Sequence, residues 1–389
     1  MSRTIRALLA AALITSAGVS TASASPGQPA EIARPATSRV IPDQYLVTLD
    51  VGIDLNGVLS KLGVKALFSY GTVFTGFAAK LNTLQVALLR KIPGFRGIEA
   101  DMQIDALDVR ESDAAVNSWG LDRINQRALP LDGAYTPAHD GSNVTAYILD
   151  TGIEHTHPDF GGRATFGFDA IGDGRRGVDC NGHGTHVAGT VGGAQFGVAK
   201  RVKLVSVRVL GCDGRGTWSG VVAGFDWIAA NARKPAVMNA SLGGAPPSDA
   251  VDNAANAVAN RGIFVAVAGG NDAADACGYS PARAAQPFTI GATTRTDGYA
   301  TYSNRGQCVQ LLAPGTDITS AWIGGTVKTI SGTSMATPHV AGTVALLKQT
   351  VGDKTQAEVM NALWNNATQG KITSVPASTP NRLLFAGGL

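Results

Sequence analysis

The feature that most constrains the fold is a regular alternation of short apolar runs with longer helical patterns. Residues 144–150 form a β-branched and aromatic run typical of a buried strand, and residues 334–350 form the longest helical pattern. Further strand-like runs and helical patterns alternate between them, at 203–210, 219–232, 236–241, 249–261 and 263–268. Short runs separated by helices indicate a parallel sheet with helices on both faces. The sequence therefore predicts an α/β fold for the larger part of the chain.

A second, smaller pattern precedes this region, in residues 40–111. It consists of strand-like and helical segments in the order β-α-β-β-α-β. These lie at 43–49, 54–62, 69–81, 83–90 and 97–107, and the range 69–81 holds a pair of strands. This order is typical of a small α+β domain with a ferredoxin-like fold. A chain of 389 residues is long enough for one large domain and one small one. A permanent accessory domain and a removable one both fit the pattern.

Residues 1–24 have the features of a secretory signal. Arg3 and Arg6 supply positive charge, residues 7–19 are apolar, and the Ala-Ser-Ala tripeptide at 22–24 provides small residues for cleavage. A transmembrane anchor is the alternative, but the apolar core is short for a bilayer span. We therefore expect a secreted, extracellular protein with no membrane span after processing.

Composition narrows the possible partners. The formal net charge is only +3 and no cluster of Lys and Arg is present, so we expect no nucleic-acid partner. The 48 glycines suit tight turns and close approach of a backbone to a substrate. Residues 25–39 are rich in Pro, Ala and Ser and are expected to form a linker.

Ser334 is the candidate nucleophile. It lies in the small-residue segment 332–342, just where the last helical pattern begins. The first N–H groups of a helix have no intrahelical partner and create a positive local field, which would stabilise an alkoxide or an oxyanion. A helix N-cap serine is the alternative interpretation of this residue taken alone.

Asp150 and His183 are the candidate partners of this serine. Asp150 ends the first strand-like run, and the carboxyl ends of strands are where open α/β sheets place their sites. His183 opens a small-residue helical segment. A serine hydroxyl needs a base to take its proton, and the base needs a buried carboxylate to fix its tautomer. His186 is the main rival for the base. Asp159 and Asp169 are rivals for the carboxylate, but neither is expected to end an apolar strand.

The segments around these three residues resemble the signature blocks of the subtilases, the subtilisin-like serine proteases. Subtilisin is itself a standard example of the Asp-His-Ser triad. The similarity continues at 238–244 and 264–272, covers the chain from about residue 119 to its C-terminus, and is greatest with the proteinase K and aqualysin group. An esterase of the α/β-hydrolase type would carry its serine first in the chain, in a Gly-x-Ser-x-Gly turn, whereas here the serine comes last.

The resemblance implies a role for each candidate residue. Ser334 would attack a peptide carbonyl, His183 would act as general base, and Asp150 would orient the imidazole. Asn271 would donate to the oxyanion, an interaction typically worth about 3 kcal/mol of transition-state stabilisation. The residues implied for substrate binding form two extended edges, a pocket wall and an aromatic contact at P4: Gly214, Arg215, Gly216, Trp218, Ser241, Leu242, Gly243, Ala268, Gly269 and Gly270.

The implied substrate site favours broad specificity. Two extended edges would bind a peptide by adding it as a strand, which demands little of the peptide sequence. No carboxylate stands obviously at the base of the P1 pocket, whose wall would include residues 268–270. We therefore expect an apolar or aromatic residue at P1. Arg215 is larger than the small residue common at its position and would disfavour basic residues nearby.

The sequence contains four cysteines, which allow three pairings, and an exported protein can keep disulfides. Free buried thiols are the alternative. The resemblance implies the pairs Cys180–Cys212 and Cys277–Cys308. Each unstrained crosslink of this loop length could contribute about 3 kcal/mol.

The resemblance also implies structural calcium, but this chain departs from the family pattern. In one family site two backbone carbonyls, at Ala285 and Pro287 here, join a carboxylate, and this chain has Gln310 at the carboxylate position. At a second site Asn125 and Ala128 replace acidic residues. Because a hard divalent ion prefers ionised oxygen, we expect lower calcium dependence or a shift to other ligands, and we assign no metal ligand. Catalysis itself should need no cofactor.

The small domain at 40–111 resembles the inhibitory propeptide of secreted subtilases. The resemblance implies an intramolecular inhibitor that also assists a slow-folding parallel sheet. Its removal near residue 112 would leave a peptidase domain at 112–389. We predict a monomeric serine endopeptidase that acts on proteins or peptides and processes itself from a preproenzyme. The alternatives on the same fold are a catalytically silent peptide-binding protein and an enzyme active only in self-processing.

Overall fold

The computed structural model describes residues 39–107, 109–111 and 118–389. The expected signal at 1–24, nearly all of the expected linker, and residues 112–117 just after the expected processing point lie outside the described residues. Among the helices of the described part, none has both the length and the apolar character that a membrane span requires.

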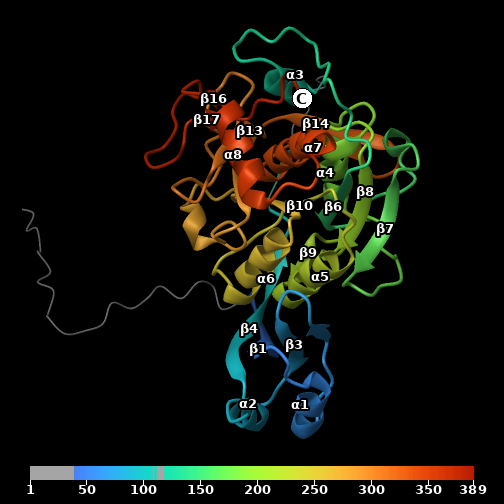
Figure 1. Ribbon diagram of the computed structural model, residues 1–389, viewed down its shortest axis with the longest axis vertical. Helices are drawn as coiled ribbons and strands as arrows, with labels where there is room; N and C mark the ends of the chain where they lie inside the picture. Colours follow the sequence, from blue (N-terminus) through green and yellow to red (C-terminus); the bar gives the residue numbers. More distant parts are fainter. Residues whose placement is uncertain (1–38, 108, 112–117) are drawn as a thin grey trace, which may run out of the picture. The chain divides into compact units, whose positions relative to one another are not determined.

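The N-terminal domain is an antiparallel sheet packed against two short helices (blue to cyan in Figure 1). Its elements are β1 (Val40–Leu49), α1 (Leu55–Leu62), β2 (Phe68–Tyr70), β3 (Thr75–Lys80), α2 (Thr83–Leu89) and β4 (Phe95–Asp105). The strand order is β2-β3-β1-β4, and all neighbours are antiparallel. This is the ferredoxin-like arrangement that the order of strands and helices in the sequence predicts.

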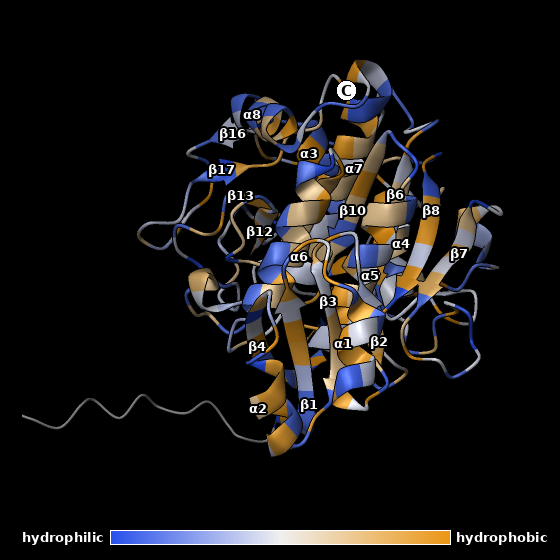
Figure 2. Ribbon diagram, turned by 60° about the horizontal axis from the view of Figure 1, so that its bottom comes forward, coloured by the Kyte–Doolittle hydropathy of each residue, from blue (hydrophilic) through white to orange (hydrophobic). Residues whose placement is uncertain are grey.

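Local signals set the ends of these two helices. Asp54 caps α1 by accepting the N–H of Asn56, and Gly63 ends the helix in the left-handed region at φ 64°. Asn82 and Gln85 form a capping box at α2. Figure 2 shows hydrophobic and hydrophilic residues on both helices, as expected for helices with one covered face. The hydrophobic residues pack with those of the sheet in a single cluster.

The larger domain is built on a nine-stranded sheet in the order β16-β17-β13-β12-β11-β10-β6-β8-β7. Its strands are β6 (Thr145–Asp150), β7 (Ala164–Asp169), β8 (Lys203–Arg208), β10 (Ala236–Ala240), β11 (Phe264–Ala268), β12 (Phe288–Thr293), β13 (Leu311–Pro314), β16 (Thr368–Gln369) and β17 (Arg382–Leu383). Neighbours from β17 to β7 are parallel, and β16 is antiparallel to β17. The four apolar runs that the sequence predicts as strands are β6, β8, β10 and β11, which lie side by side.

Helices cover both faces of this sheet, as the sequence predicts. They are α3 (Trp119–Asn125), α4 (His183–Gly192), α5 (Trp218–Asn231), α6 (Asp249–Asn260), α7 (Thr333–Val351) and α8 (Gln356–Asn366). Ala146 and Ile148 of β6 belong to the cluster packed with α4 and α7, whereas Tyr147 and Leu149 belong to the cluster packed with α5 and α6. Successive strand residues point to opposite faces, so a strand covered on both faces must be apolar throughout.

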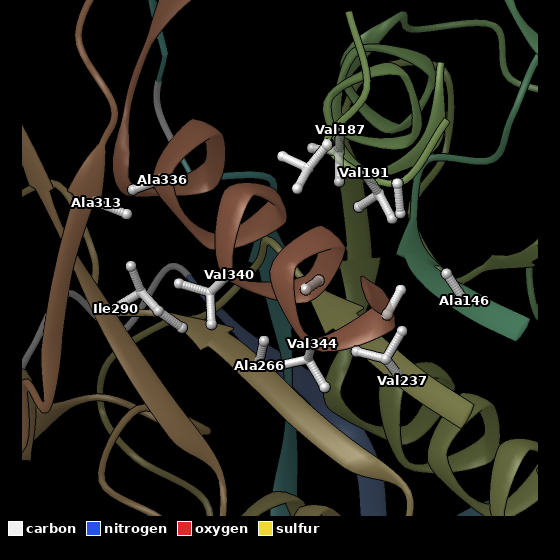
Figure 3. Packing of buried hydrophobic residues seen from close by; sticks show 14 of the residues in the cluster. Ala146, Val187, Val191, Val237, Ala266, Ile290, Ala313, Ala336, Val340 and Val344 are labelled. Atoms are coloured by element: carbon white, nitrogen blue, oxygen red, sulfur yellow. The ribbon is translucent and has the colours of Figure 1, made fainter. Parts of the chain in front are cut away.

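Helices α4 and α7 pack side by side on one face (Figure 3). Val187 and Val191 of α4 and Val340 and Val344 of α7 belong to one buried cluster, and Val340 and Val344 point toward Ile290, Ala266 and Val237 of the sheet. Both helices begin at the carboxyl edge of the sheet, because each follows a segment that leaves that edge. The packing therefore brings the first turn of α4 and the first turn of α7 into one region.

Two short strands, β9 (Arg215–Thr217) and β5 (Arg110–Glu111), pair with strands that are distant in the sequence. β9 pairs with β4 of the N-terminal domain, so the small sheet extends onto the larger domain. The hairpin of β14 (Ile318–Trp322) and β15 (Thr326–Ser331) pairs with β5. These two contacts hold the segment after β4 along the edge where α4 and α7 begin.

Candidate active site

A buried aspartate and a buried histidine form the centre of the candidate site. Asp150 is the last residue of β6, and His183 is the first residue of α4. Nδ1 of His183 lies 2.7 Å from Oδ1 of Asp150. Burial by itself would lower the pKa of His183, but the charge and hydrogen bond of Asp150 and the charge of Asp179 outweigh it and raise the pKa. Within the described residues, Nε2 of His183 has no hydrogen-bond partner, so it is the nitrogen that can take a proton.

The turn before α4 is ordered by Asp179, a residue that the sequence analysis did not single out. The carboxylate accepts hydrogen bonds of 2.6–3.0 Å from the N–H groups of Asn181, Gly182 and Thr185 and from the hydroxyls of Thr185 and Thr151. An anion at a helix N-terminus is favoured by the orphan N–H groups and the helix dipole. The sequence signal for a role of Asp179 is its position four residues before His183, but the sequence does not reveal which groups the carboxylate binds.

Ser334 is the second residue of α7 and is fully buried. Its hydroxyl donates to the carbonyl of Ser241 at 3.2 Å, and its own carbonyl accepts from the hydroxyl of Ser241 at 2.9 Å. The N-cap residue Gly332 offers no side chain to the first N–H groups of the helix. The serine therefore lies at a helix start that can stabilise an anion. Its hydroxyl is bonded to a backbone carbonyl rather than to the imidazole.

Asn271 lies beside the same helix start. Its Oδ1 accepts from the N–H of Thr333 at 2.9 Å and from the hydroxyl of Thr333 at 2.8 Å. Its Nδ2 is close to Gly332, where an added Cβ would lie 3.0 Å from it. Because Thr333 holds the carbonyl end of the amide, the NH2 end is turned toward the first turn of α7. A donor in that orientation suits an oxyanion formed next to Ser334.

The rival histidines have structural contacts. Nε2 of His186 lies 3.0 Å from the carbonyl of Ile318 and 3.1 Å from the carbonyl of Lys328, in the β14–β15 hairpin. Burial lowers the pKa of His186 to about 3. Nδ1 of His339 lies 2.8 Å from the carbonyl of Met335, and burial lowers its pKa to about 4. Both side chains are therefore neutral packing groups near neutral pH.

The rival aspartates bind elsewhere. Asp169 does end a strand, β7, but this is not one of the buried apolar strands. β7 is the edge strand of the sheet and is half exposed, so it lacks a continuous apolar run. The carboxylate of Asp169 pairs with Arg208 at 3.1 Å, and Asp159 accepts the N–H of Gln195 at 2.6 Å. Neither is bonded to His183 in the structure.

The two expected substrate edges flank a segment of the chain itself. β4 and β9 form antiparallel pairs, namely Gln103 with Thr217, Ile104 with Gly216, and Asp105 with Arg215. The next residue, Ala106, donates its N–H to the carbonyl of Gly214 at 2.7 Å and forms an antiparallel bridge with Leu242. The edges at 214–216 and 241–243 therefore bind an extended backbone between them, in the manner of an added strand.

Side chains of this segment meet two of the expected specificity residues. Trp218 is almost fully buried and packs in the same hydrophobic cluster as Ile104. Arg215 is exposed and forms an ion pair of 3.3 Å with Asp105. An apolar residue thus faces the aromatic position expected at P4, and an acidic residue faces the arginine.

A small cavity of about 160 Å³ lies next to Leu107. Its lining includes Gly243, Gly244, Asn271, Asp272 and Tyr279. The lining includes Asp105 as well as Asp272 but not residues 268–270 of the expected P1 wall, so the expectation that no carboxylate stands at the base of the P1 pocket stays a prediction. Leu107 itself is 8% exposed, so an apolar side chain is covered at this position.

Asn304 is a second residue that sequence analysis missed. Its Nδ2 donates to the carbonyl of Gly269 at 2.9 Å, and its Oδ1 accepts the N–H groups of Asp272 and Ala274 at 3.1 and 2.9 Å. This buried amide therefore shapes the turn on which Asn271 stands. No signal in the local sequence around Asn304 points to a turn about thirty residues earlier.

Two disulfides join Cys180 to Cys212 and Cys277 to Cys308, the pairing that the resemblance implies. The first ties the turn before His183 to the loop before β9. It therefore connects the segment that holds the candidate base to the segment that holds one substrate edge.

The positions discussed for calcium do not offer ionised oxygens. Oε1 of Gln310 accepts the N–H of Thr289 at 3.0 Å, so the side chain is used within the fold. The carbonyl of Ala128 accepts from the side chain of Gln126. In the described ranges, no group of three or more His, Cys, Asp and Glu side chains is arranged to hold a metal ion. A neutral amide fits a hard divalent ion poorly, and we derive no step through a metal.

The chain is similar to serine proteases over most of its length. A family model described as "Subtilase family" matches residues 141–383. The extracellular serine proteinase of Thermus sp. is 49% identical over 318 residues, which cover 81% of this chain and 76% of that protein. The cuticle-degrading protease of Metarhizium anisopliae is 39% identical over 371 residues, 92% of this chain and 94% of that protein.

Two further similarities add detail. The alkaline serine exoprotease A of Vibrio alginolyticus is 46% identical over 336 residues, which cover 86% of this chain but only 62% of that longer protein. A solved structure titled as the crystal structure of a cold adapted subtilisin-like serine proteinase matches with a TM-score of 0.68 and 50% identity. The match covers 70% of this chain and 99% of that one.

Proposed function

Because this chain belongs to the subtilase family of serine proteases, we propose that it is a secreted serine endopeptidase that cleaves proteins through an acyl-enzyme. The observation that carries the proposal is the buried 2.7 Å pair between Asp150 and His183, together with Ser334 in the first turn of α7. Relatives whose names describe extracellular proteases, and the signal-like residues 1–24, support secretion.

The acylation step begins at the hydroxyl of Ser334. The hydroxyl turns from the carbonyl of Ser241 toward Nε2 of His183, which takes its proton as Oγ attacks the peptide carbonyl. A catalytic hydrogen bond that is absent before substrate binds is common, and it forms in the reactive complex. Asp150 accepts from Nδ1 and stabilises the imidazolium. The imidazolium then protonates the leaving amine, and the carbonyl carbon remains bonded to Ser334 as an ester.

The oxyanion is stabilised by two kinds of donor. The donors are the side-chain NH2 of Asn271, whose carbonyl end is held by Thr333, and the backbone N–H of Ser334 in the first turn of α7. Water then attacks the ester with His183 again as the base, and the carboxylic acid product leaves. No cofactor is required for any of these steps.

The decisive test is hydrolysis of a chromogenic peptide with leucine or phenylalanine at P1 by the purified secreted protein. Ser334→Ala should reduce kcat about 10⁶-fold, because the remaining site cannot form the acyl-enzyme. Turnover by the wild type and none by the variant supports the proposal. A folded wild type that cuts itself but never turns over the peptide supports the self-processing alternative. A folded wild type that does neither supports the silent peptide-binding alternative.

We infer that the N-terminal domain acts as an intramolecular inhibitor before it is released. Its acidic residues bind helix starts of the peptidase domain. Asp101 is fully buried and accepts the N–H of Ser219 at 3.1 Å, and Glu99 accepts the N–H of Ala250 and the hydroxyl of Ser248, both at 2.8 Å. In the opposite direction, Asp226 of α5 accepts three N–H groups from residues 71–73. These contacts support a domain bound in a defined position over the substrate edges.

The segment that follows this domain supports endopeptidase action and an apolar preference at P1. The chain passes along the substrate edges and continues beyond them, so the cleft accepts a chain interior rather than only a chain end. Leu107 is covered in a cavity that Gly243 and Asn271 also line, and Asp272 adds a negative charge to the same lining. We therefore propose leucine or an aromatic residue at P1. We also propose that the enzyme is a monomer and that its dependence on calcium is low.

A further inference from the structure

We infer that the first self-cleavage of this chain breaks the peptide bond on the carboxyl side of Leu107. The inference rests on the proposed protease function and goes beyond it, because it selects one bond. It also differs from the boundary near residue 112 that family resemblance implies. The argument uses backbone pairing on each side of the candidate nucleophile and the side-chain environment between the two paired stretches.

Before Leu107, the chain is held as a strand with a definite register. The antiparallel pairs with β9 end at Asp105, and the N–H of Ala106 then donates to the carbonyl of Gly214 at 2.7 Å. Successive side chains of a strand point to opposite faces, so Ile104 and Ala106 share one face and Asp105 and Leu107 share the other. Ile104 is buried in a hydrophobic cluster, Asp105 is turned to exposed Arg215, and Leu107 is covered again.

After Leu107, the chain is held a second time, by the strand that leads to Ser334. Arg110 pairs antiparallel with Ser331 at the end of β15, only three residues before Ser334. The guanidinium of Arg110 also lies over the ring of Tyr302, 5.2 Å from its centre. Paired residues therefore stand before and after Leu107 in the chain, and the bonds between residues 107 and 110 are the ones that lie between the two paired stretches.

The position of the oxyanion donor Asn271 indicates which of these bonds is cleaved. Asn271 lines the same cavity as Leu107, and this cavity also contains Gly243 of the second expected substrate edge. A carbonyl must lie beside both the oxyanion donors and the nucleophile to react. The carbonyl of Leu107 is the one that belongs to the residue covered in that cavity. Leu107 is therefore the P1 residue, with Ala106 and Ile104 as P2 and P4.

The step balances without any added reactant except water. Oγ of Ser334 forms a bond to the carbonyl carbon of Leu107, and its proton passes to Nε2 of His183. The bond from that carbon to the following nitrogen breaks, and the nitrogen takes the proton from His183 to become a new α-amine. Water then cleaves the ester and leaves Leu107 with a carboxylate. Any cut near residue 112 is a later event, made after this one.

The test follows the intact chain over time by mass spectrometry and N-terminal sequencing, together with turnover of a leucine peptide. The expected first products are a fragment that ends at Leu107 and a fragment whose N-terminus is the next residue in the sequence. The rate of this cut should not change on tenfold dilution, because the reacting groups belong to one molecule. Ser334→Ala should give neither fragment.

A matched pair of variants tests the role of the side chain. Leu107→Asp places a charge in the P1 cavity and should slow the first cut about tenfold or more. Leu84→Asp changes an equally apolar residue that is 75% exposed on α2 of the same domain, and it should leave the rate unchanged. Once released, the Leu107→Asp enzyme should turn over the peptide normally, because the mature chain lacks residue 107.

The outcomes separate this inference from the proposed function. If the wild type turns over the peptide but no fragment ending at Leu107 is found at any time, the inference is wrong and the protease function stands. If the cut at Leu107 accelerates in proportion to concentration, it is made by another molecule and the intramolecular step is wrong. If a folded wild type neither cuts itself nor turns over the peptide, both proposals are wrong.

Discussion

Buried carboxylates meet the N-termini of helices in two regions of this molecule. At α4 the acids come from the peptidase domain itself. Asp179 accepts N–H groups of the first turn, and Asp150 is bonded to the imidazole of His183, the first residue of the helix. At α5 and α6 the acids come from the N-terminal domain, with Asp101 and Glu99 bonded to the N–H groups of the second helical residues. Asp179, Asp101 and Glu99 share one chemistry, since each accepts an N–H group at a helix start, whereas Asp150 holds the imidazole of His183.

The two regions differ in whether water can replace the carboxylate at the helix start. The acids at α4 are buried inside one domain and cannot be exchanged for water without unfolding it. The acids at α5 and α6 lie at an interface, so separation hydrates both the carboxylates and the helix N–H groups. The same interaction therefore fixes the first turn of α4 permanently in the first region, whereas in the second it forms a reversible contact between the N-terminal domain and the peptidase domain. The predictions below test that contrast, in order of decreasing effect.

Asp150→Asn should have the largest effect. The substitution keeps the shape but removes the charge that holds the correct tautomer of His183, so kcat should fall about 10⁴-fold. The measurement is kcat on a leucine peptide, with folding checked by circular dichroism. Asp169→Asn is the control, because that carboxylate pairs with Arg208 rather than with the histidine. Equal losses in the two variants would contradict the assignment of Asp150.

Asp179→Asn should have the next largest effect, with a signature in the pH profile. His183 must be neutral to take a proton, and its raised pKa places the acid limb of kcat/KM above pH 6.5. Removal of the charge of Asp179 lowers that pKa, so the limb should move to lower pH. Loss of the turn contacts should also reduce kcat, by up to about 10²-fold. A loss of activity without a shift of the limb would mean that Asp179 only shapes the turn.

Asp101→Asn should weaken the reversible contact without changing the mature enzyme. A hydrogen bond to a charged group contributes about 1.5–3 kcal/mol, so the released N-terminal domain should inhibit about ten- to a hundredfold less well. The measurement is the lag between self-cleavage and the appearance of peptidase activity, which should shorten. Asp50→Asn is the control, because Asp50 is exposed and pairs with Arg96 inside the same domain. An unchanged lag for Asp101→Asn would remove this acid from the inhibitory contact.

Glu99→Gln should have the smallest effect, visible mainly as a change of pH dependence. Burial raises the pKa of Glu99 above its ordinary value of 4.5, although its hydrogen bonds to Ser248 and Ala250 lower it. A raised pKa in the bound state favours binding below pH 4.5, and that advantage is lost as pH rises through the bound-state pKa. Release of the domain should therefore become easier with rising pH, and Glu99→Gln should flatten the profile. A variant that keeps the wild-type profile would assign the pH dependence to another group.

The central strands and the long helix were predictable because their signals are local. The strands β6, β8, β10 and β11 are apolar at every position, since both faces are covered, and a parallel sheet with helices on both faces follows. The N-terminal domain was predictable for the same reason, from the order of its short patterns. The edge strand β7 was the exception. Its partial exposure removes the apolar run, so Asp169 was not recognised as the end of a strand.

The residue types at the candidate site were also available from the sequence, through their motifs and the family resemblance. Their partners were not. Asp179 binds Thr151 just after β6 and Thr185 of α4, Asn304 shapes a turn about thirty residues away, and Asp272 lines the cavity beside Leu107. Such contacts depend on how the elements are stacked, and no local pattern encodes them.

By itself, the sequence determined the fold class, the family, and the residues that can act as nucleophile, base and carboxylate, because propensity, periodicity and motif spacing are properties of short segments. Only the tertiary structure decided which of two buried histidines meets a carboxylate, since His183 and His186 lie one turn apart on the same helix. Only the tertiary structure decided that Leu107 lies in the cleft, because that register depends on pairing between strands more than a hundred residues apart. Burial and charge at a point in space come from several segments at once, and folding alone brings those segments together.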